Sequence, residues 1–160
     1  MRAREVMNQF VPHVGVDQNV KDVARLMRDE GAGCVCVCDE QGVPVGVITD
    51  RDIVVRACVG ETALGELNAG SIMTERPVVC GLDTDLEQVQ QTMHVHNIFR
   101  VIVVDERGVL RGAVSLAEIW HHQNALAASA LSRKLAGRHL RLARPGGHFV
   151  IGRHSFPVRP

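Results

Sequence analysis

Two short motifs place a hydroxyl three residues before a carboxylate, each after an apolar run. In GVITDRD, Thr49 precedes Asp52, and in GAVSLAE, Ser115 precedes Glu118. A carboxylate can accept both hydrogens of a ribose diol, and a hydroxyl can donate to a phosphate or ribose oxygen. Each motif also opens a predicted helix, whose free N–H groups and partial positive charge suit a phosphate. The motif taken alone is more typical of a helix cap, in which hydroxyl and acid bond to the helix backbone.

The elements that must position these motifs occur twice. Shifting the chain by 66 residues aligns the two motifs and gives about 13 identities in some 50 positions, among them Met7 with Met73 and Gly42 with Gly108. Each copy contains a short strand, a helix with apolar residues three and four apart, a hairpin and a second helix. The sequence therefore predicts a βαββα unit that is used twice.

The charge distribution separates a body from a tail. Residues 1–118 carry 18 acidic and 11 basic groups, and the seven Lys or Arg beyond Glu118 bring the formal net charge to zero. An acid-free basic tail could bind nucleic acid or an acidic partner, could stay disordered, or could pack on the acidic body. We predict a first repeat at 1–58, a linker at 59–69, a second repeat at 70–123, and a helical extension with a basic tail at 124–160.

A βαββα repeat of this period, whose hairpin ends in Gly-x-x-Thr/Ser-x-x-Asp, resembles the cystathionine-β-synthase (CBS) domain. The resemblance covers about residues 4–122, including the lead-ins REVMNQF and GSIMTERPV. It implies an α+β fold in which two repeats pair with pseudo-two-fold symmetry, a Bateman module. It also implies a regulatory, non-enzymatic role, with an adenine nucleotide (AMP, ADP or ATP) or another adenosyl ligand bound in the cleft between the repeats and no required cofactor.

The resemblance further implies which residues contact that ligand. Positions matching Thr49 and Asp52 contact phosphate and ribose, and Gly46 would let the ligand approach the backbone closely. Since Glu118 is one methylene longer than the family's aspartate, we expect one tight site per chain, at Asp52. The other candidate ligand-binding residues are His13, Val14, Gly33, Cys34 and Arg51 from the first copy, and Val79, Phe99, Arg100, Ser115 and Glu118 from the second. Any single arginine among them could instead be a surface charge, and either valine could be core.

Other candidate chemistry is weaker. Cys34, Cys36 and Cys38 alternate along a predicted strand, so their thiols share one face; buried apolar packing is favoured over a redox or metal site. Neither His94–His96 nor His121–His122 has the spacing that puts two imidazoles on one metal. We find no catalytic constellation and therefore predict neither an enzyme nor a metal site.

The remaining patterns concern location and assembly. No apolar run approaches the ~20 residues of a bilayer span, and the N-terminal MRAREVMNQF lacks the apolar region of a secretory signal. With five cysteines, an odd number, the chain is expected in the cytoplasm, away from membranes. The helices holding Ile53, Val54, Ile119 and Trp120 have more apolar residues than one buried face uses, which predicts a homodimer, although core packing alone is the alternative. A second functional interpretation is a ligand-free dimerisation scaffold that presents the basic tail.

Overall fold

The structure is a computed structural model that describes residues 1–123, 148–151 and 154–157. Residues Met1–Ile119 form one compact unit, and Trp120–Pro160 form another. In the second unit, strands β8 (His148–Ile151) and β9 (His154–Pro157) pair as an antiparallel hairpin. The helical extension and most of the basic tail predicted from the sequence lie outside the described residues. No helix of the described part is both long and apolar enough to cross a membrane.

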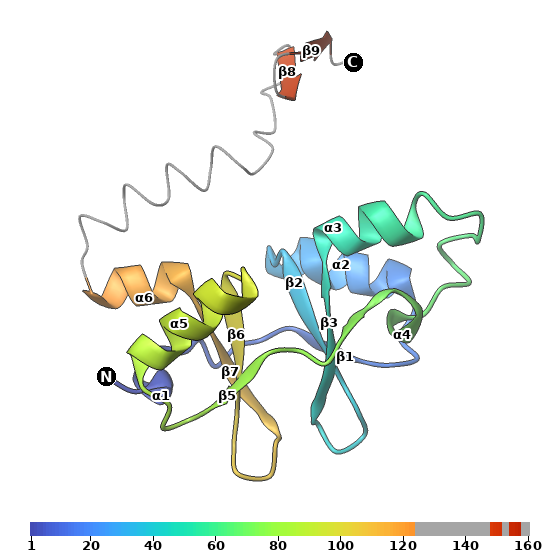
Figure 1. The fold of residues 1–160 in the computed structure, drawn as a ribbon. Coiled ribbons are helices and arrows are strands. Elements are labelled where there is room, and N and C mark those ends of the chain that lie inside the picture. Colours follow the sequence, from blue (N-terminus) through green and yellow to red (C-terminus); the bar gives the residue numbers. More distant parts are fainter. Residues whose placement is uncertain (124–147, 152–153, 158–160) are drawn as a thin grey trace. The chain divides into compact units, whose positions relative to one another are not determined.

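The larger unit contains the predicted α+β repeat twice (Figure 1). The first copy comprises β1 (His13–Gly15), α2 (Val20–Glu30), β2 (Cys34–Cys38), β3 (Pro44–Thr49), the short helix α3 (Asp50–Asp52) and the π-helical segment η1 (Ile53–Ala57). The second copy comprises β5 (Val79–Gly81), α5 (Leu86–His96), β6 (Arg100–Val104), β7 (Leu110–Ser115) and α6 (Leu116–Gln123). The tandem CBS-like pair expected from the sequence is confirmed.

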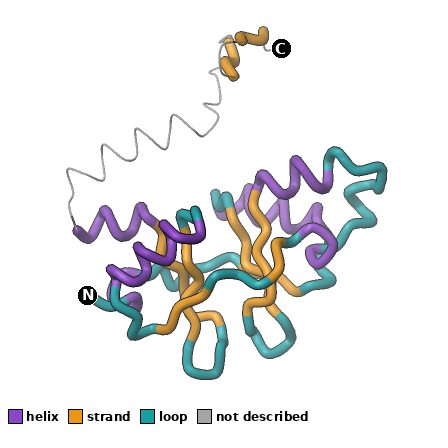
Figure 2. Tube along the Cα trace, viewed as in Figure 1, coloured by secondary structure: helices purple, strands orange, loops and turns teal. Residues whose placement is uncertain are grey.

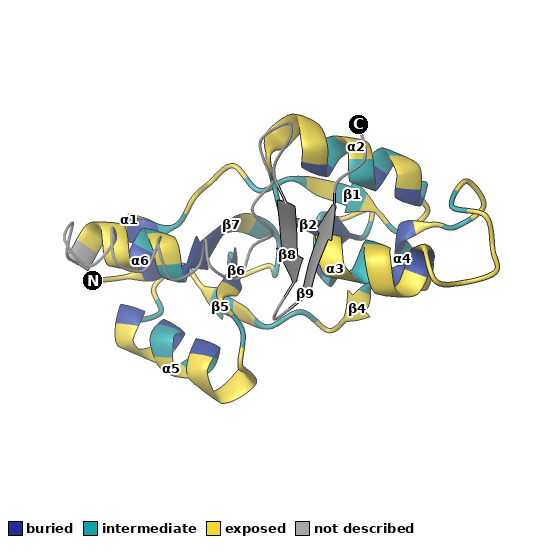
Figure 3. Ribbon diagram, turned by 90° about the horizontal axis from the view of Figure 1, so that it is seen from above, coloured by how far each residue is buried: buried dark blue, intermediate teal, exposed yellow. Residues whose placement is uncertain are grey.

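The long helix of the first repeat follows the periodicity read from the sequence. In α2, Val20, Val23 and Met27 are buried on one side, and in Figure 3 the dark buried turns alternate with exposed ones along the helix. The side chain of Asn19 accepts a hydrogen bond from Lys21 N and caps the helix start. Gly31 ends the helix in the left-handed conformation, with φ at 61°.

The two sheets have matching registers. In the first, β1 runs parallel to β2 and β2 antiparallel to β3, with Cys34 opposite Thr49. In the second, β5, β6 and β7 repeat this order, with Arg100 opposite Ser115. The two hairpin turns lie side by side (Figure 2), where Leu110 N donates to the carbonyl of Gly42 at 3.0 Å.

The segment that precedes each repeat packs on the other repeat. Helix α1 (Ala3–Val6) buries Ala3 and Val6 among the core residues of the second copy, such as Leu86. Helix α4 (Ala69–Ile72) packs in the first core in the same way, and β4 (Thr74–Glu75) adds a strand to β3. Each lead-in therefore completes the opposite half of the unit.

A third apolar cluster joins the two sheets. It consists of the buried residues Cys36 and Cys38 from β2, Ile102 from β6 and Ala113 from β7. The two cysteines thus serve as small buried apolar groups, the use that the sequence favoured. This cluster, which we call the seam, lies beside the candidate site described next.

Candidate functional site

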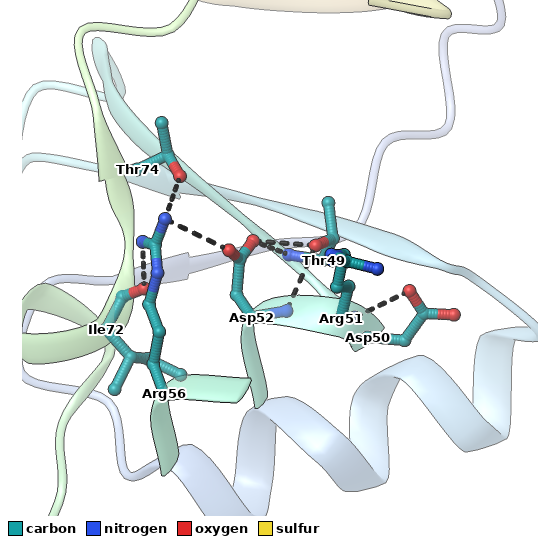
Figure 4. Close-up of polar contacts among 7 residues, drawn as sticks. All are labelled: Thr49, Asp50, Arg51, Asp52, Arg56, Ile72 and Thr74. Carbon is teal, nitrogen blue, oxygen red and sulfur yellow. Dashed lines mark hydrogen bonds and ion pairs between the residues drawn. The ribbon is translucent and has the colours of Figure 1, made fainter. Parts of the chain in front are cut away.

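The first motif forms a closed hydrogen-bond network at the start of α3 (Figure 4). One carboxylate oxygen of Asp52, Oδ2, accepts from Thr49 N at 2.8 Å and from Thr49 Oγ1 at 2.6 Å. Asp52 N in turn donates to Thr49 Oγ1 at 3.2 Å. The capping arrangement that the spacing indicated is therefore present, and it uses both side chains that a ligand would need.

Arg56 occupies the second oxygen of the same carboxylate. Its guanidinium lies 3.3 Å from Asp52 Oδ1 and donates to the carbonyl of Ile72 at 2.8 Å and to Thr74 Oγ1 at 3.1 Å (Figure 4). Both oxygens of Asp52 thus have partners within the chain, and its side chain is only 14% exposed. Arg51 is exposed, and its backbone N–H donates to Asp50 Oδ1 at 2.8 Å.

The second motif is engaged less completely. Glu118 Oε2 accepts from Ser115 N at 2.6 Å, and Glu118 N donates to Ser115 Oγ at 3.4 Å, while Ser115 itself is buried. The position equivalent to Arg56 is His122, so this carboxylate has no arginine at the matching position. Within the described residues, Glu118 therefore keeps one oxygen available for a ligand.

A cavity of about 250 Å³ lies between the repeats beside Glu118. It brings together three of the residues selected from the sequence, Cys34, Arg100 and Glu118. Its remaining walls come from the first lead-in, the end of α2 and the seam. The other lining residues are Asn8, Phe10, Val11, Pro12, Glu30, Gly31, Ala32, Cys36, Ile102 and Ala113.

The lead-in residues of this cavity were missed by sequence reasoning. They lie before the first strand, and only the exchange of lead-ins between repeats carries them to the cleft. The one available signal was Phe10, an aromatic residue in a chain that is only 3% aromatic. Phe10 is 76% exposed and lines the cavity.

Several candidate residues lie elsewhere. Val79 and Phe99 are exposed, His13 is exposed with its ring Nδ1 3.1 Å from the carbonyl of Val11, and Val14 packs against the first core. Gly33 accepts a hydrogen bond at its carbonyl from Asp50 N at 3.3 Å. None of these five residues lines the cavity beside Glu118.

Gly46 has a packing role that differs from the predicted one. The space beside its α-carbon is filled by Met73, whose Cγ would lie 2.9 Å from an added Cβ. The equivalent Gly112 is approached by Asn8 O and by the Sδ of Met7, each at 2.8 Å from such a Cβ. The close approach that these glycines permit in the structure is therefore to the exchanged lead-ins, and the approach of a ligand to Gly46 stays a prediction.

The thiols beside the cavity are held in their neutral form. Burial raises the pKa of the Cys34 thiol, and the neighbouring Arg100 offsets part of this effect. The pKa of Cys36 is raised by its contact with Cys38, whose Sγ lies 3.9 Å away, and by burial. Among the described residues, no group of three or more His, Cys, Asp or Glu side chains could hold a metal ion.

The helical face predicted to form a dimer is only partly available. Ile119 is fully buried in the second core, so the apolar face of α6 that carries it is used inside the repeat, and only other residues of this helix are available to a partner. Val54 and Val55 of η1 are 60% and 53% exposed, and Trp120 is 36% exposed. We call Val54, Val55 and the exposed Val59 the valine patch.

Two βαββα repeats with exchanged lead-ins and a cavity between their sheets define a tandem repeat module. The CBS domain family matches residues 3–57 and 69–119. The chain therefore belongs to the CBS domain family and carries two copies of the domain.

Individual relatives agree with this assignment. The chain is 31% identical over 135 residues to the CBS domain-containing protein YhcV of Bacillus subtilis, covering 81% of this chain and 91% of YhcV. It is similar to the crystal structure of Hypoxic Response Protein I with two coordinated zinc ions, at a TM-score of 0.71 and 27% identity, covering 78% of this chain and 100% of that one. It also shares its fold with the CBS domain protein PAE2072 from Pyrobaculum aerophilum complexed with AMP, at a TM-score of 0.69 and 21% identity over 83% of this chain and 99% of that one.

Proposed function

We propose that the chain is a regulatory, non-catalytic module that senses an adenine nucleotide or another adenosyl ligand in the cleft between its CBS repeats. The observation that carries this proposal is the cavity between the repeats, where Glu118 and Arg100 meet an apolar wall. PAE2072, which has the same fold, was solved with AMP, and this supports the choice of ligand class.

The lining matches the three parts of such a ligand. The available oxygen of Glu118 can accept from the ribose diol, and Arg100 can donate to a phosphate. Phe10 and Pro12 offer flat apolar surface to a base. Ser115 positions Glu118 through its backbone N–H, and Cys34 fills the space beside Arg100.

The geometry favours the Glu118 side of the cleft over the Asp52 side. A ribose at Asp52 would have to displace either the hydrogen bonds from Thr49 or the contact with Arg56. At Glu118 it would meet a carboxylate with one oxygen free among the described contacts. We therefore assign ligand binding first to Glu118, although the sequence favoured Asp52.

A ligand in the cavity beside Glu118 would contact both repeats of the larger unit. The cavity has walls from the first lead-in and from both sheets, so a bound ligand bridges segments that belong to different repeats. A ligand that tightens these contacts stabilises the seam, and this is how occupancy would be signalled to a partner. The five cysteines are all free, which supports the proposed cytoplasmic location.

Calorimetric titration with adenosine, AMP, ADP, ATP and S-adenosylmethionine tests the proposal. A ligand present at about 100 times its dissociation constant should stabilise the protein by roughly 2.7 kcal/mol, which a thermal-shift assay detects.

Variants of the two carboxylates test where the ligand binds. Glu118→Ala should weaken binding about ten-fold to a hundred-fold. Glu118→Gln should retain the hydrogen bond that caps the helix and serves as a folding control. Asp52→Ala should bind within about three-fold of wild type, because the ligand does not use that carboxylate. Loss of binding in Asp52→Ala with normal binding in Glu118→Ala would instead place the ligand at Asp52.

The valine patch favours a second candidate function, a ligand-free dimerisation scaffold. Three exposed valines near one another in sequence exceed the isolated apolar residues usual on a monomer surface. The basic tail that such a scaffold would present lies mostly outside the described residues. If no adenosyl ligand binds and the chain sediments as a dimer, the scaffold is the better description.

A further inference from the structure

The charged side chains around the cavity are mostly acidic. Its lining includes one cation, Arg100, and two carboxylates, Glu30 and Glu118. A polyanionic ligand would therefore meet a net negative lining, in which Glu30 and Arg100 are exposed and Glu118 is half-buried.

Glu30 is an unexpected residue for its position. It is the last residue of α2, where the partial negative charge of the helix end disfavours a carboxylate. The nearby Arg28 is engaged by Asp29, with Nε 2.7 Å from Oδ1. Within the described part of the chain, Glu30 has no hydrogen bond or ion pair. Its carboxylate is thus left un-neutralised beside the cavity.

The single cation can serve only a small anionic group. Arg100 lies at the start of β6, beside the neutral thiol of Cys34. One guanidinium suits one phosphate, whereas the additional phosphates of a triphosphate would approach the glutamates without a second arginine of the lining. The volume of about 250 Å³ also falls just below the usual range of ligand cavities, roughly 300 to 1,000 Å³.

We propose that the cavity beside Glu118 selects adenosine ligands with no more than one phosphate group and discriminates against the triphosphate. Glu30 and Glu118 supply the repulsion, and Arg100 supplies the one favourable anion contact. The inference rests on the proposed function, because it concerns the ligand of the same cavity.

Displacement of radiolabelled adenosine tests this selectivity at one site, since a nucleotide bound elsewhere would not compete. The assay is run with EDTA and without Mg²⁺, which would neutralise the triphosphate. AMP should displace adenosine at a concentration about ten-fold or more below that required for ATP. In Glu30→Gln the ratio of the ATP concentration to the AMP concentration required for displacement should fall by about three-fold or more, because one repulsive charge is removed. The matched control Glu87→Gln, on the exposed first turn of α5 and outside the cavity lining, should keep the wild-type ratio.

The outcomes separate the two proposals. If ATP displaces adenosine as readily as AMP does, or if Glu30→Gln leaves the ratio unchanged, the charge selectivity is wrong while the ligand-sensing function stands. If neither adenosine, nor any adenine nucleotide, nor S-adenosylmethionine binds, the proposed function itself fails.

Discussion

The guanidinium of Arg56 lies 3.3 Å from the carboxylate of Asp52, one helical turn earlier, and also holds the backbone of Ile72. This contact ties the end of the first repeat to the lead-in of the second. It also explains why Asp52, which the sequence singled out as a ligand-binding carboxylate, already has an intramolecular partner.

Removing this tie should destabilise the protein moderately. Arg56→Ala loses two hydrogen bonds and a partly exposed ion pair, so we expect a loss of about 1 to 2 kcal/mol in the free energy of unfolding. Urea denaturation measures the change. Arg51→Ala, an exposed arginine in the same segment, is the control and should stay within about 0.5 kcal/mol of wild type. Equal losses in both variants would contradict the structural role of Arg56.

The glycines that face the lead-ins should not tolerate a methyl group. Gly112→Ala would press its Cβ against the backbone oxygen of Asn8, which cannot move without shifting the lead-in, so we expect a loss of about 1 to 3 kcal/mol. Gly46→Ala meets the flexible side chain of Met73 and should lose less. In Gly15→Ala the added Cβ has no atom within 4 Å, and thermal unfolding of this control should match wild type.

The cavity thiol provides a chemical reporter. Because burial raises the pKa of Cys34 above the ordinary value of 9.0, little reactive thiolate is present at pH 7. Alkylation of Cys34 by iodoacetamide should be slow at pH 7 and should accelerate until the pH passes that raised pKa. The exposed Cys58 is the comparison residue. Adenosine should protect Cys34 and not Cys58 in peptide mass spectrometry; equal protection of both would argue against a ligand in the cavity.

The valine patch predicts the mode of self-association. Val54→Asp should convert a dimer to monomers without loss of folding, since Val54 is exposed in the protomer and a charge is unfavourable in an apolar interface. Sedimentation at micromolar concentration measures the state. Val95→Asp, at an equally exposed valine of α5, should remain dimeric. A monomeric wild-type protein would rule out this interface at that concentration.

Local chemistry was readable from the sequence. The turn glycines Gly42 and Gly108 both have φ at 80°, as hairpin turns ending in Asp-x-x-Gly require. Thr49 and Ser115 both accept the hydrogen bonds of a helix cap. These features depend on residues within a few positions of each other, and a prediction of this kind is stronger when the same pattern occurs in both repeats.

Contacts between distant segments could not be read in the same way. Nothing in the spacing of Ala3 and Val6 indicates that they pack in the core that contains Leu86 and not in the core that contains Val20. The apolar face of a short helix could be buried in either core. The hydrogen bond from Arg56 to the carbonyl of Ile72 depends on that same choice of partners, because Ile72 belongs to the lead-in of the second repeat. The lining of the candidate cavity depends on the exchange of lead-ins as well, since Phe10 reaches the cleft only through the exchanged lead-in.

The crossed lead-ins reproduce within one chain the geometry of a domain-swapped homodimer. A half-length chain with one repeat would have to place its own lead-in on a second molecule, and it would form the same cores by dimerising. Joining two such halves turns a concentration-dependent assembly into an intramolecular one. It also frees the two halves to diverge, as Asp52 with Arg56 and Glu118 with His122 have done at matching positions. Heat or denaturant should therefore unfold both repeats in one transition, since neither core is complete without the other half of the chain.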